Sequence, residues 1–348
     1  MYILGIETSC DETAASVVKD GRRILSNSIA SSLSLHKRYW GVVPEIAFRM
    51  QLETITQIAN SAIKEARIDL KDVGLISVTN GPGLLGSLLV GISFAKSASL
   101  GLGIPLLGIN HLYSHIYASF LENSHVSLPF VSLVVSGGHT SLFYLKDFDK
   151  IQLLGSTQDD ACGEAFDKVA KILGLGYPGG PLIERLSKNG NPRKIRLGCS
   201  KTENPLDFSF SGIKTAVLYY VRKMTQNSKL PAYPAGRQTP CLSGRQANSK
   251  LIRDIAASFQ ETVIDTLIKK SVLACKLKNT KRLVVGGGVA ANSRLREKFY
   301  EIAREKGLTI YFPSKKLCTD NAAMVAGLGY QLFKKGYISG LDLNADLN

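Results

Sequence analysis

The chain has 348 residues, 45% of them hydrophobic. That length exceeds what one hydrophobic core usually serves, so two lobes are expected. The longest apolar stretch, Leu84 to Leu100, is interrupted by glycine, serine and lysine, which favours a buried core helix over a membrane span. The first residues lack the basic and apolar regions of an export signal, so we expect a soluble, cytoplasmic protein.

The net charge of +15 is unevenly distributed along the chain. Residues 1–180 carry 14 basic and 16 acidic side chains, whereas residues 181–348 carry 29 and 12, a net charge of +17. This asymmetry indicates a polyanionic partner, although a solvated basic surface that aids solubility would look the same. Six cysteines lie far apart without a Cys-x-x-Cys pair, so neither a disulfide framework nor a structural zinc site is expected.

Two strand–turn–strand units of similar design occur in the chain. The first runs from Tyr2–Thr8 through the polar turn Ser9–Glu12 to Ala14–Val18. The second spans Phe130–Tyr144 and breaks at S-G-G-H-T. The repetition predicts a duplicated α/β lobe in which both polar turns face a shared cleft.

The segments between and after these units have helical or strand patterns. The first lobe is expected to end near Gly108, and residues 230–250, rich in proline and glycine, are expected to form a surface insertion. The predicted helices cover residues 51–66, 83–99, 163–173, 211–224, 251–276 and 293–306, and the predicted strands cover residues 73–79 and 282–285.

Two histidines and a distant aspartate form a candidate metal site. His111 and His115 are four residues apart, so both imidazoles lie on one face of a helix. Leu112 occupies the position where the zincin motif needs a glutamate, which disfavours a metallopeptidase. Asp320 is the candidate third ligand, and such a set leaves coordination positions open for substrate oxygens. The alternative is that the histidines only pack or lie on the surface.

Three turns rich in glycine or hydroxyl groups, at residues 8–13, 135–140 and 286–292, could hold phosphate or sugar oxygens through backbone N–H groups. The third follows a strand and precedes a basic helix, as phosphate loops do. Any one of these turns could be purely structural. In the first turn, Asp11 and Glu12 suit a cation, an ammonium group or a hydroxyl better than a bare phosphate.

Two further features each allow two interpretations. Asp167 lies on an amphipathic helix, where it could serve a site or pair with Lys171 at the solvent-facing surface. The segment His36–Trp40 mixes basic and aromatic residues, which suits stacking on an exposed base or a plain surface loop.

Nine motifs, in order along nearly the whole chain, resemble the bacterial TsaD family of tRNA adenosine threonylcarbamoyltransferases, once described as glycoproteases. They are I-E-T-S-C-D-E-T (6–13), G-V-V-P-E-I-A (41–47), N-H-L-Y-S-H (110–115), V-S-G-G-H-T (135–140), G-E-A-F-D-K (163–168), Y-P-G-G-P (177–181), F-S-F-S-G-I-K-T (208–215), G-G-V-A-A-N (287–292) and C-T-D-N-A-A-M (318–324).

The resemblance implies an α/β fold of the two-lobed actin-like, sugar-kinase-like (ASKHA) ATPase class. Residues 1–108 with about 325–348 would form the N-terminal lobe, and residues 109–324 the C-terminal lobe. It also implies transfer of the threonylcarbamoyl group from threonylcarbamoyl-AMP to N6 of adenosine 37, in tRNAs that read codons beginning with A. The products would be t6A and AMP.

The resemblance further implies the roles of the candidate residues. His111, His115 and Asp320 would bind one divalent metal, Fe(2+) in most of the family and Zn(2+) in some. Asp11 and Glu12 match acidic positions near the reacting group and are the candidate catalytic residues. The residues expected to contact the adenylate are Val135, Ser136, Gly137, Gly138, His139, Asp167, Gly180, Glu184 and Asn292.

Family members work with accessory proteins of the TsaB and TsaE families, so both are expected partners along with tRNA. The chain departs from the family pattern at Trp40, Phe48 and Gln51, where glycine, a small residue and histidine are expected. Three other functions remain open: a small-molecule kinase of the same fold, a metallopeptidase and a non-enzymatic tRNA-binding scaffold.

Overall fold

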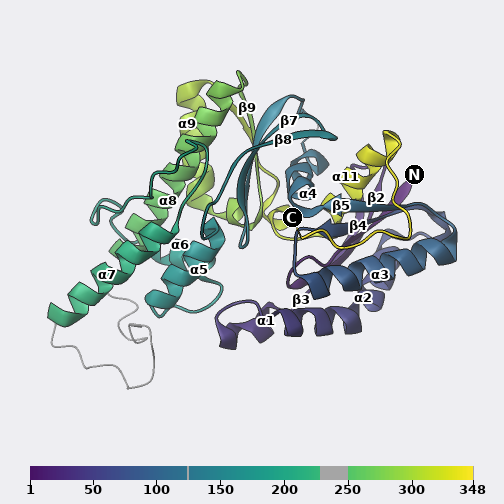
Figure 1. The fold of residues 1–348 in the computed structure, drawn as a ribbon, viewed down its shortest axis with the longest axis horizontal. Helices are drawn as coiled ribbons and strands as arrows, with labels where there is room; N and C mark the ends of the chain where they lie inside the picture. The colour runs from purple at the N-terminus through teal and green to yellow at the C-terminus, as the bar shows by residue number, and fades with distance from the viewer. Residues whose placement is uncertain (124, 228–249, 348) are drawn as a thin grey trace.

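The computed structural model describes residues 1–123, 125–227 and 250–347, which form two α/β lobes, each built on a five-stranded sheet (Figure 1). The first sheet has the strand order β3-β2-β1-β4-β5 and the second the order β10-β9-β6-β7-β8. The strands are β1 (Tyr2–Glu7), β2 (Glu12–Lys19), β3 (Arg23–Ser31), β4 (Val73–Gly81), β5 (Leu106–Asn110), β6 (Phe130–Val135), β7 (Thr140–Asp147), β8 (Lys150–Ser156), β9 (Arg282–Gly286) and β10 (Thr309–Tyr311).

The central strands of the two sheets have the same pairing. Strand β1 pairs antiparallel with β2 and parallel with β4. Strand β6 pairs antiparallel with β7 and parallel with β9. The two predicted hairpins are therefore confirmed, as is their placement at equivalent positions of a duplicated architecture.

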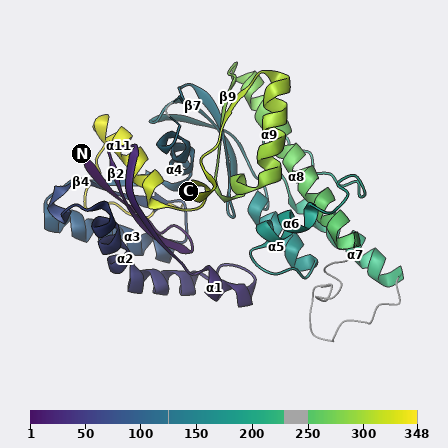
Figure 2. The same ribbon diagram turned by 180° about the vertical axis from the view of Figure 1, so that it is seen from behind.

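Helices cover the sheets and connect the lobes. The helix α11 lies on one side of the first sheet, and α2 and α3 lie on the other (Figures 1 and 2). The helices are α1 (Leu33–His36), α2 (Pro44–Ala66), α3 (Leu85–Leu102), α4 (His111–Tyr117), α5 (Cys162–Ile172), α6 (Gly179–Ser187), α7 (Ser211–Asn227), α8 (Lys250–Leu277), α9 (Ser293–Lys306), α10 (Lys315–Cys318) and α11 (Ala322–Lys334).

The periodicity of the sequence located most of these elements. Helix α9 has the predicted bounds, whereas α2 starts earlier than predicted because Pro44 fits the first helical position. Strands β3, β5 and β8 were not predicted. Strands β3 and β8 alternate weakly between buried and exposed positions, so tertiary pairing rather than local pattern defines them. The predicted insertion at 230–250 falls almost entirely on residues 228–249, outside the described residues.

The segment predicted to be a loop at His36–Trp40 forms helical turns instead. The ring of His36 is buried, with its Nε2 atom 2.9 Å from Oγ of Ser32 and its Nδ1 atom accepting a hydrogen bond from the Val43 amide. His36 therefore cannot stack on a base, while Trp40 remains exposed. Trp40 has φ of 62°, the left-handed region that favours glycine, which is the residue expected there from the family pattern.

Among the described residues, α3 alone is long and apolar enough to cross a membrane, with 18 residues and a mean hydropathy of 1.4. It packs against β4 and α2 and buries Leu88 and Ile92, but only 33% of the helix is buried, so it covers one face of the sheet and is not the buried core helix that was predicted. The five described cysteines are free.

The last helix returns to the first sheet, where a glycine permits its close approach. Helix α11 packs across β1 and β2. A Cβ atom on Gly5 would lie 2.2 Å from the carbonyl oxygen of Ala322 and 2.9 Å from Cβ of Ala326. The contact brings the start of α11 onto the first sheet, and the predicted division of the chain into lobes stays a prediction.

Gly5→Ala should therefore lower the free energy of unfolding by about 1–3 kcal/mol, because the added methyl group forces α11 away from β1. A denaturation series would measure this decrease. The matched control is Gly101→Ala in α3, where an added Cβ meets nothing within 4 Å and should be neutral or slightly stabilising. Equal stability of the Gly5→Ala protein and the unsubstituted protein would contradict the packing argument.

Candidate metal and substrate site

Helix α4 places two imidazoles side by side. It starts directly after β5, and the side chain of Asn110 caps it by accepting hydrogen bonds from the amides of Leu112 and Tyr113. His111 and His115 lie one turn apart, and their ring centroids are 4.6 Å from each other. Both residues are buried, so they are not surface histidines.

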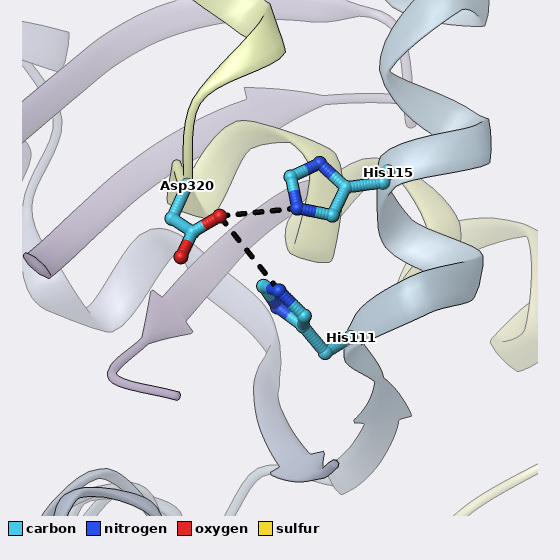
Figure 3. A group of neighbouring side chains, drawn as sticks. All are labelled: His111, His115 and Asp320. Carbon is cyan, nitrogen blue, oxygen red and sulfur yellow. Dashed lines mark ion pairs between the residues drawn. The ribbon is translucent and has the colours of Figure 1, made fainter. Parts of the chain in front are cut away.

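Asp320 comes to these rings from the other end of the chain, between α10 and α11 (Figure 3). Its neighbour Asn321 caps α11 through the Met324 amide and donates to the carbonyl oxygen of Thr319, which fixes the turn. Oδ1 of Asp320 lies 3.0 Å from Nε2 of His115 and 3.7 Å from Nε2 of His111.

The three side chains fit a divalent metal. One potential ligand atom from each lies within 4.8 Å of the other two. Both ring nitrogens of His115 are buried without a hydrogen bond of acceptable geometry, even though Asp320 is near. Because a buried imidazole nitrogen without a partner is costly, a cation at Nε2 would supply the missing interaction. Two nitrogens and one carboxylate oxygen are a donor set that iron(II) and zinc accept.

A buried carboxylate behind His111 sets the orientation of that ring. Oε2 of Glu7, at the end of β1, lies 3.1 Å from Nδ1 of His111 and also accepts a hydrogen bond from the Thr79 hydroxyl at 2.6 Å. Its Oε1 accepts from the Ser9 amide at 2.6 Å. Since an ionised carboxylate only accepts, we assign the hydrogen to Nδ1, which turns Nε2 toward Asp320. This is the carboxylate–histidine arrangement found behind many metal ions.

The electrostatics of this cluster favour positive charge. Burial alone would lower the pKa of His111, but the carboxylates of Glu7 and Asp320 outweigh it and raise the pKa to about 9. Burial would raise the pKa of Asp320, but His111 and His115 hold it below its usual range. The pKa of Glu7 is likewise lowered, because His111 outweighs the effect of burial. The ionised carboxylates of Glu7 and Asp320 therefore surround the two imidazole rings with negative charge.

The first polar turn lies beside this cluster. Burial, followed by the charges of Asp320 and Asp11, raises the pKa of Glu12 well above its usual range. The side-chain amide of Gln51 donates to the carbonyl oxygens of Cys10 and Glu12, both at 2.9 Å. The departure from the family pattern at Gln51 thus provides a clamp on the turn.

The other departure on α2, Phe48, lies against α3. A Cβ atom on Gly86 would lie 2.8 Å from the Phe48 ring, so the large side chain fits only because residue 86 is glycine. This residue packs α2 on α3 and does not reach the metal ligands.

The second polar turn docks onto the start of α5. The Ser136 amide donates to the carbonyl oxygen of His139, and the amides of Gly163 and Glu164 donate to the carbonyl oxygens of Ser136 and Gly137. Val135 is the buried last residue of β6. An added Cβ at Gly137 or at Gly138 would meet nothing within 4 Å, so the turn presents bare backbone to open space.

Asp167 faces a neighbouring turn rather than Lys171. Its Oδ1 accepts a hydrogen bond from the Gly179 amide at 2.6 Å, which holds the first turn of α6. Burial, partly offset by this hydrogen bond, raises the pKa of Asp167 to about 6. A Cβ atom on Gly180 would meet nothing within 4 Å, so the backbone is open there as well.

The third turn closes the site. An added Cβ on Gly287 would lie 2.3 Å from the carbonyl oxygen of Val135, and Gly287 has φ of 92°, so only glycine fits. Asn292 caps α9 through the Leu295 amide and donates to Oε1 of Gln260, while Glu184 accepts from the Ser293 amide.

These turns surround a cavity of about 190 Å³. Five of the nine residues expected to contact the adenylate line this cavity. The other four, Val135, Ser136, Gly138 and His139, do not. The lining residues are Gly137, Gly163, Phe166, Asp167, Pro178, Gly180, Pro181, Glu184, Gly288, Val289, Ala291 and Asn292.

His139 joins the cavity turn to the metal cluster. It ends the second polar turn, and its ring centroid lies 6.2 Å from that of His111. Burial and the charges of His111 and His115 lower its pKa to about 4, so the ring is neutral at pH 7. The end of the second polar turn therefore lies near His111 of the metal cluster.

Sequence reasoning missed Glu7, Gln51 and Gln260 as parts of this site. Glu7 carried a usable signal, because an acidic residue that ends an otherwise apolar strand needs a buried partner. Gln51 and Gln260 lie on long helices whose pattern does not distinguish them from other polar positions.

Comparisons with known proteins identify the family. The sequence profile for "TsaD: tRNA N6-adenosine threonylcarbamoyltransferase" matches residues 23–327. A protein of that name from Thermodesulfovibrio yellowstonii is 50% identical over 345 residues, which cover 99% of this chain and 98% of the relative. Another from Symbiobacterium thermophilum is 48% identical over 343 residues, covering 99% and 95%.

Solved structures agree on the fold. HypF from T. kodakarensis matches with a TM-score of 0.63 at 14% identity, covering 98% of this chain and 49% of that chain. Component A of the Acidaminococcus fermentans (R)-2-hydroxyglutaryl-CoA dehydratase matches with a TM-score of 0.53 at 16% identity, covering 97% and 100%. The fold is thus the two-lobed ASKHA class, and the full-length sequence matches select a transferase over the kinase, peptidase and scaffold alternatives. The chain belongs to the TsaD family of tRNA N6-adenosine threonylcarbamoyltransferases.

Proposed function

We propose that this chain transfers the threonylcarbamoyl group from threonylcarbamoyl-AMP to adenosine 37 of tRNAs that read codons beginning with A. The N6 amine attacks the carbamoyl carbon, a new C–N bond forms, and the bond from that carbon to the phosphate oxygen breaks. The N6 nitrogen loses one proton, and t6A and AMP are the products. Single-stranded anticodon loops expose the base edge that this reaction needs.

The observation that carries the proposal is the position of His139. His139 belongs to the turn that would hold the adenylate, and its ring centroid lies 6.2 Å from that of His111 in the cluster that would hold a metal. A mixed anhydride bound across that junction would place its reacting carbon beside both groups. Holding reactants in a fixed geometry accounts for a large part of the rate acceleration in such reactions.

We further propose that His111, His115 and Asp320 hold one divalent metal, iron(II) or zinc. Once bound, this ion would supply Lewis acidity and a template for substrate oxygens. By holding the hydrogen on Nδ1, Glu7 would leave Nε2 of His111 available to bind the ion. Asp11 and Glu12, on the clamped first turn, are the candidate catalytic residues. The raised pKa of Glu12 allows it to hold a proton beside the reacting group.

The remaining residues would bind the adenylate part. The bare backbone at Gly137, Gly138 and Gly180 lets amide groups approach phosphate or ribose oxygens closely. Asp167, Glu184 and Asn292 line the same cavity and offer acceptors or donors for hydroxyl groups and the base. Val135 and Ser136 support the turn from behind.

The proposal places the reaction in the cytoplasm and includes the accessory proteins expected from the resemblance, those of the TsaB and TsaE families. The family membership of the chain supports the proposed reaction, and the excess of positive charge in its second half supports tRNA as the partner.

The direct test supplies the full chain with threonylcarbamoyl-AMP, an unmodified tRNA transcript, the divalent metal and the accessory proteins, followed by nucleoside mass spectrometry. The chain should produce t6A. His115→Ala should reduce the rate by about 100-fold or more, because the cluster loses a ligand. His125→Ala is the matched control, since that histidine is exposed. If the adenosine stays unmodified in reactions where another family member produces t6A, the proposal is refuted.

Glu7→Gln should weaken divalent metal binding by about 10- to 100-fold. Glu7 accepts hydrogen bonds from Thr79, His111 and the Ser9 amide through two oxygens, whereas a glutamine side chain has only one acceptor oxygen. Its NH₂ group would therefore point at one of these donors. Titration of zinc against a chelator measures the dissociation constant independently of activity. Glu53→Gln on the exposed face of α2 is the control. A wild-type dissociation constant in the Glu7→Gln protein would show that the carboxylate does not orient the ligand.

Adenosine binding should weaken as the pH falls from 7 to 5. Burial raises the pKa of Asp167 to about 6, so its carboxylate is mostly ionised at pH 7 and about nine-tenths protonated at pH 5. Loss of the anion removes a strong acceptor for a ribose hydroxyl. Calorimetry with adenosine, which lacks a titrating phosphate, should show a rise of the dissociation constant by up to about tenfold. Asp167→Asn should bind weakly and without this pH dependence, whereas a pH-independent wild type would contradict the assignment.

A further inference from the structure

A segment outside the catalytic cleft combines a firm attachment with an unusual density of positive charge. Between Glu184 and Glu203 the chain has six basic residues and no acidic one. All six side chains are exposed, and among the described residues none of them forms a salt bridge. We call residues 188–205 the strap. The six basic residues are Arg185, just before the strap, and Lys188, Arg193, Lys194, Arg196 and Lys201 within it.

The strap is fixed along one side of α8. The amide of Asn191 donates to Oδ1 of Asp254 at 2.7 Å, and the amide of Ile195 donates to Oγ of Ser258 at 3.2 Å. Near its end, the carbonyl oxygen of Pro205 accepts from Nζ of Lys270 at 3.0 Å. From residue 254 to residue 270, α8 rises about 24 Å, so the strap follows the helix for more than four turns.

The side chains of the strap divide between the helix and the solvent. Ile195 is 8% exposed and belongs to the core of the lobe, and Leu197 packs against that core. Arg193, Lys194 and Arg196 alternate with them and point outward as exposed side chains. Because the backbone is anchored, these charges are held in place rather than dispersed on a free loop.

The strap begins beside the adenylate cavity. Glu184 lines both that cavity and a second one of about 540 Å³, whose wall includes Lys188, Gly190 and Pro192 of the strap. Gly190 packs so closely on α8 that an added Cβ would lie 2.0 Å from the carbonyl oxygen of Arg253. The positively charged strap therefore starts at the edge of the adenylate cavity.

We propose that the strap binds the phosphate backbone of the substrate tRNA, next to the nucleotide that enters the cleft. The inference rests on the proposed function, because it takes tRNA as the acceptor. Exposed cations without salt-bridge partners, carried by a backbone that is anchored to α8, can contact several phosphates, and each such contact releases condensed counterions. Contacts of this kind position a nucleic acid without reading its sequence. One protein could in this way accept several tRNAs that share an anticodon-loop base.

The test compares two triple variants of the full chain that lose equal charge. The strap variant carries Arg193→Gln, Lys194→Gln and Arg196→Gln. The control carries Lys64→Gln, Arg67→Gln and Lys71→Gln at the end of α2 and just beyond it, in the other lobe (Figure 1). Dissociation constants for an unmodified tRNA transcript are measured at several salt concentrations, with and without the accessory proteins. Thermal melting and adenosine binding check that both variants are folded.

The strap variant should bind tRNA about tenfold or more weakly near 0.1 M salt. Its salt dependence should fall by about two to three units of slope, one for each phosphate that the strap no longer neutralises. The control should match the wild type.

Equal binding by the strap variant and the wild type, with transfer activity intact, would overturn the inference and leave the proposed function standing. Equally weakened binding by both variants would overturn it too, because long-range charge rather than the strap would then explain binding. A wild type that neither binds nor modifies tRNA would remove both proposals.

Discussion

The site depends on one buried contact, the carboxylate of Glu7 against the imidazole of His111. A fully buried carboxylate is unfavourable unless every oxygen is satisfied. Glu7 meets this condition by drawing Thr79 from β4, the Ser9 amide from the first turn and His111 from α4 to one point. The same hydrogen bonds that stabilise its charge thereby fix the ring orientation and tie the first sheet to the start of the second lobe.

Around that contact, close backbone packing brings together turns that are remote in sequence. The third turn lies against the ends of β6 and α4, because Gly286 and Gly287 have no side chains to hold them apart. Gly5 does the same for β1 and the start of α11, which fixes the residues directly after Asp320. The positions of the candidate ligands are thus set by backbone contacts on rigid elements. Such support holds a reacting geometry more accurately than mobile loops would.

The charges in the cleft and on the outer surface of the second lobe have opposite signs. In the cleft, the carboxylates of Glu7 and Asp320, whose pKa values are lowered, create a local negative field that suits a cation. On the outer side of the second lobe, the fixed cations of the strap face solvent. A polyanion would be repelled by the acidic cleft in the absence of a bound cation and attracted to the basic exterior.

The sequence by itself determined the two hairpins, most of the helices, the family and the histidine pair, because these depend on local periodicity or on short motifs. It also named Asp320 and the three turns, but only as separate candidates. The tertiary structure decided that they meet, since the approach of Asp320 to α4 spans about two hundred residues and depends on how α11 packs on β1. It also decided what Glu7 and Gln51 do, and that residues 188–205 form a strap on α8. Hydrogen-bond partners so distant along the chain leave no local pattern.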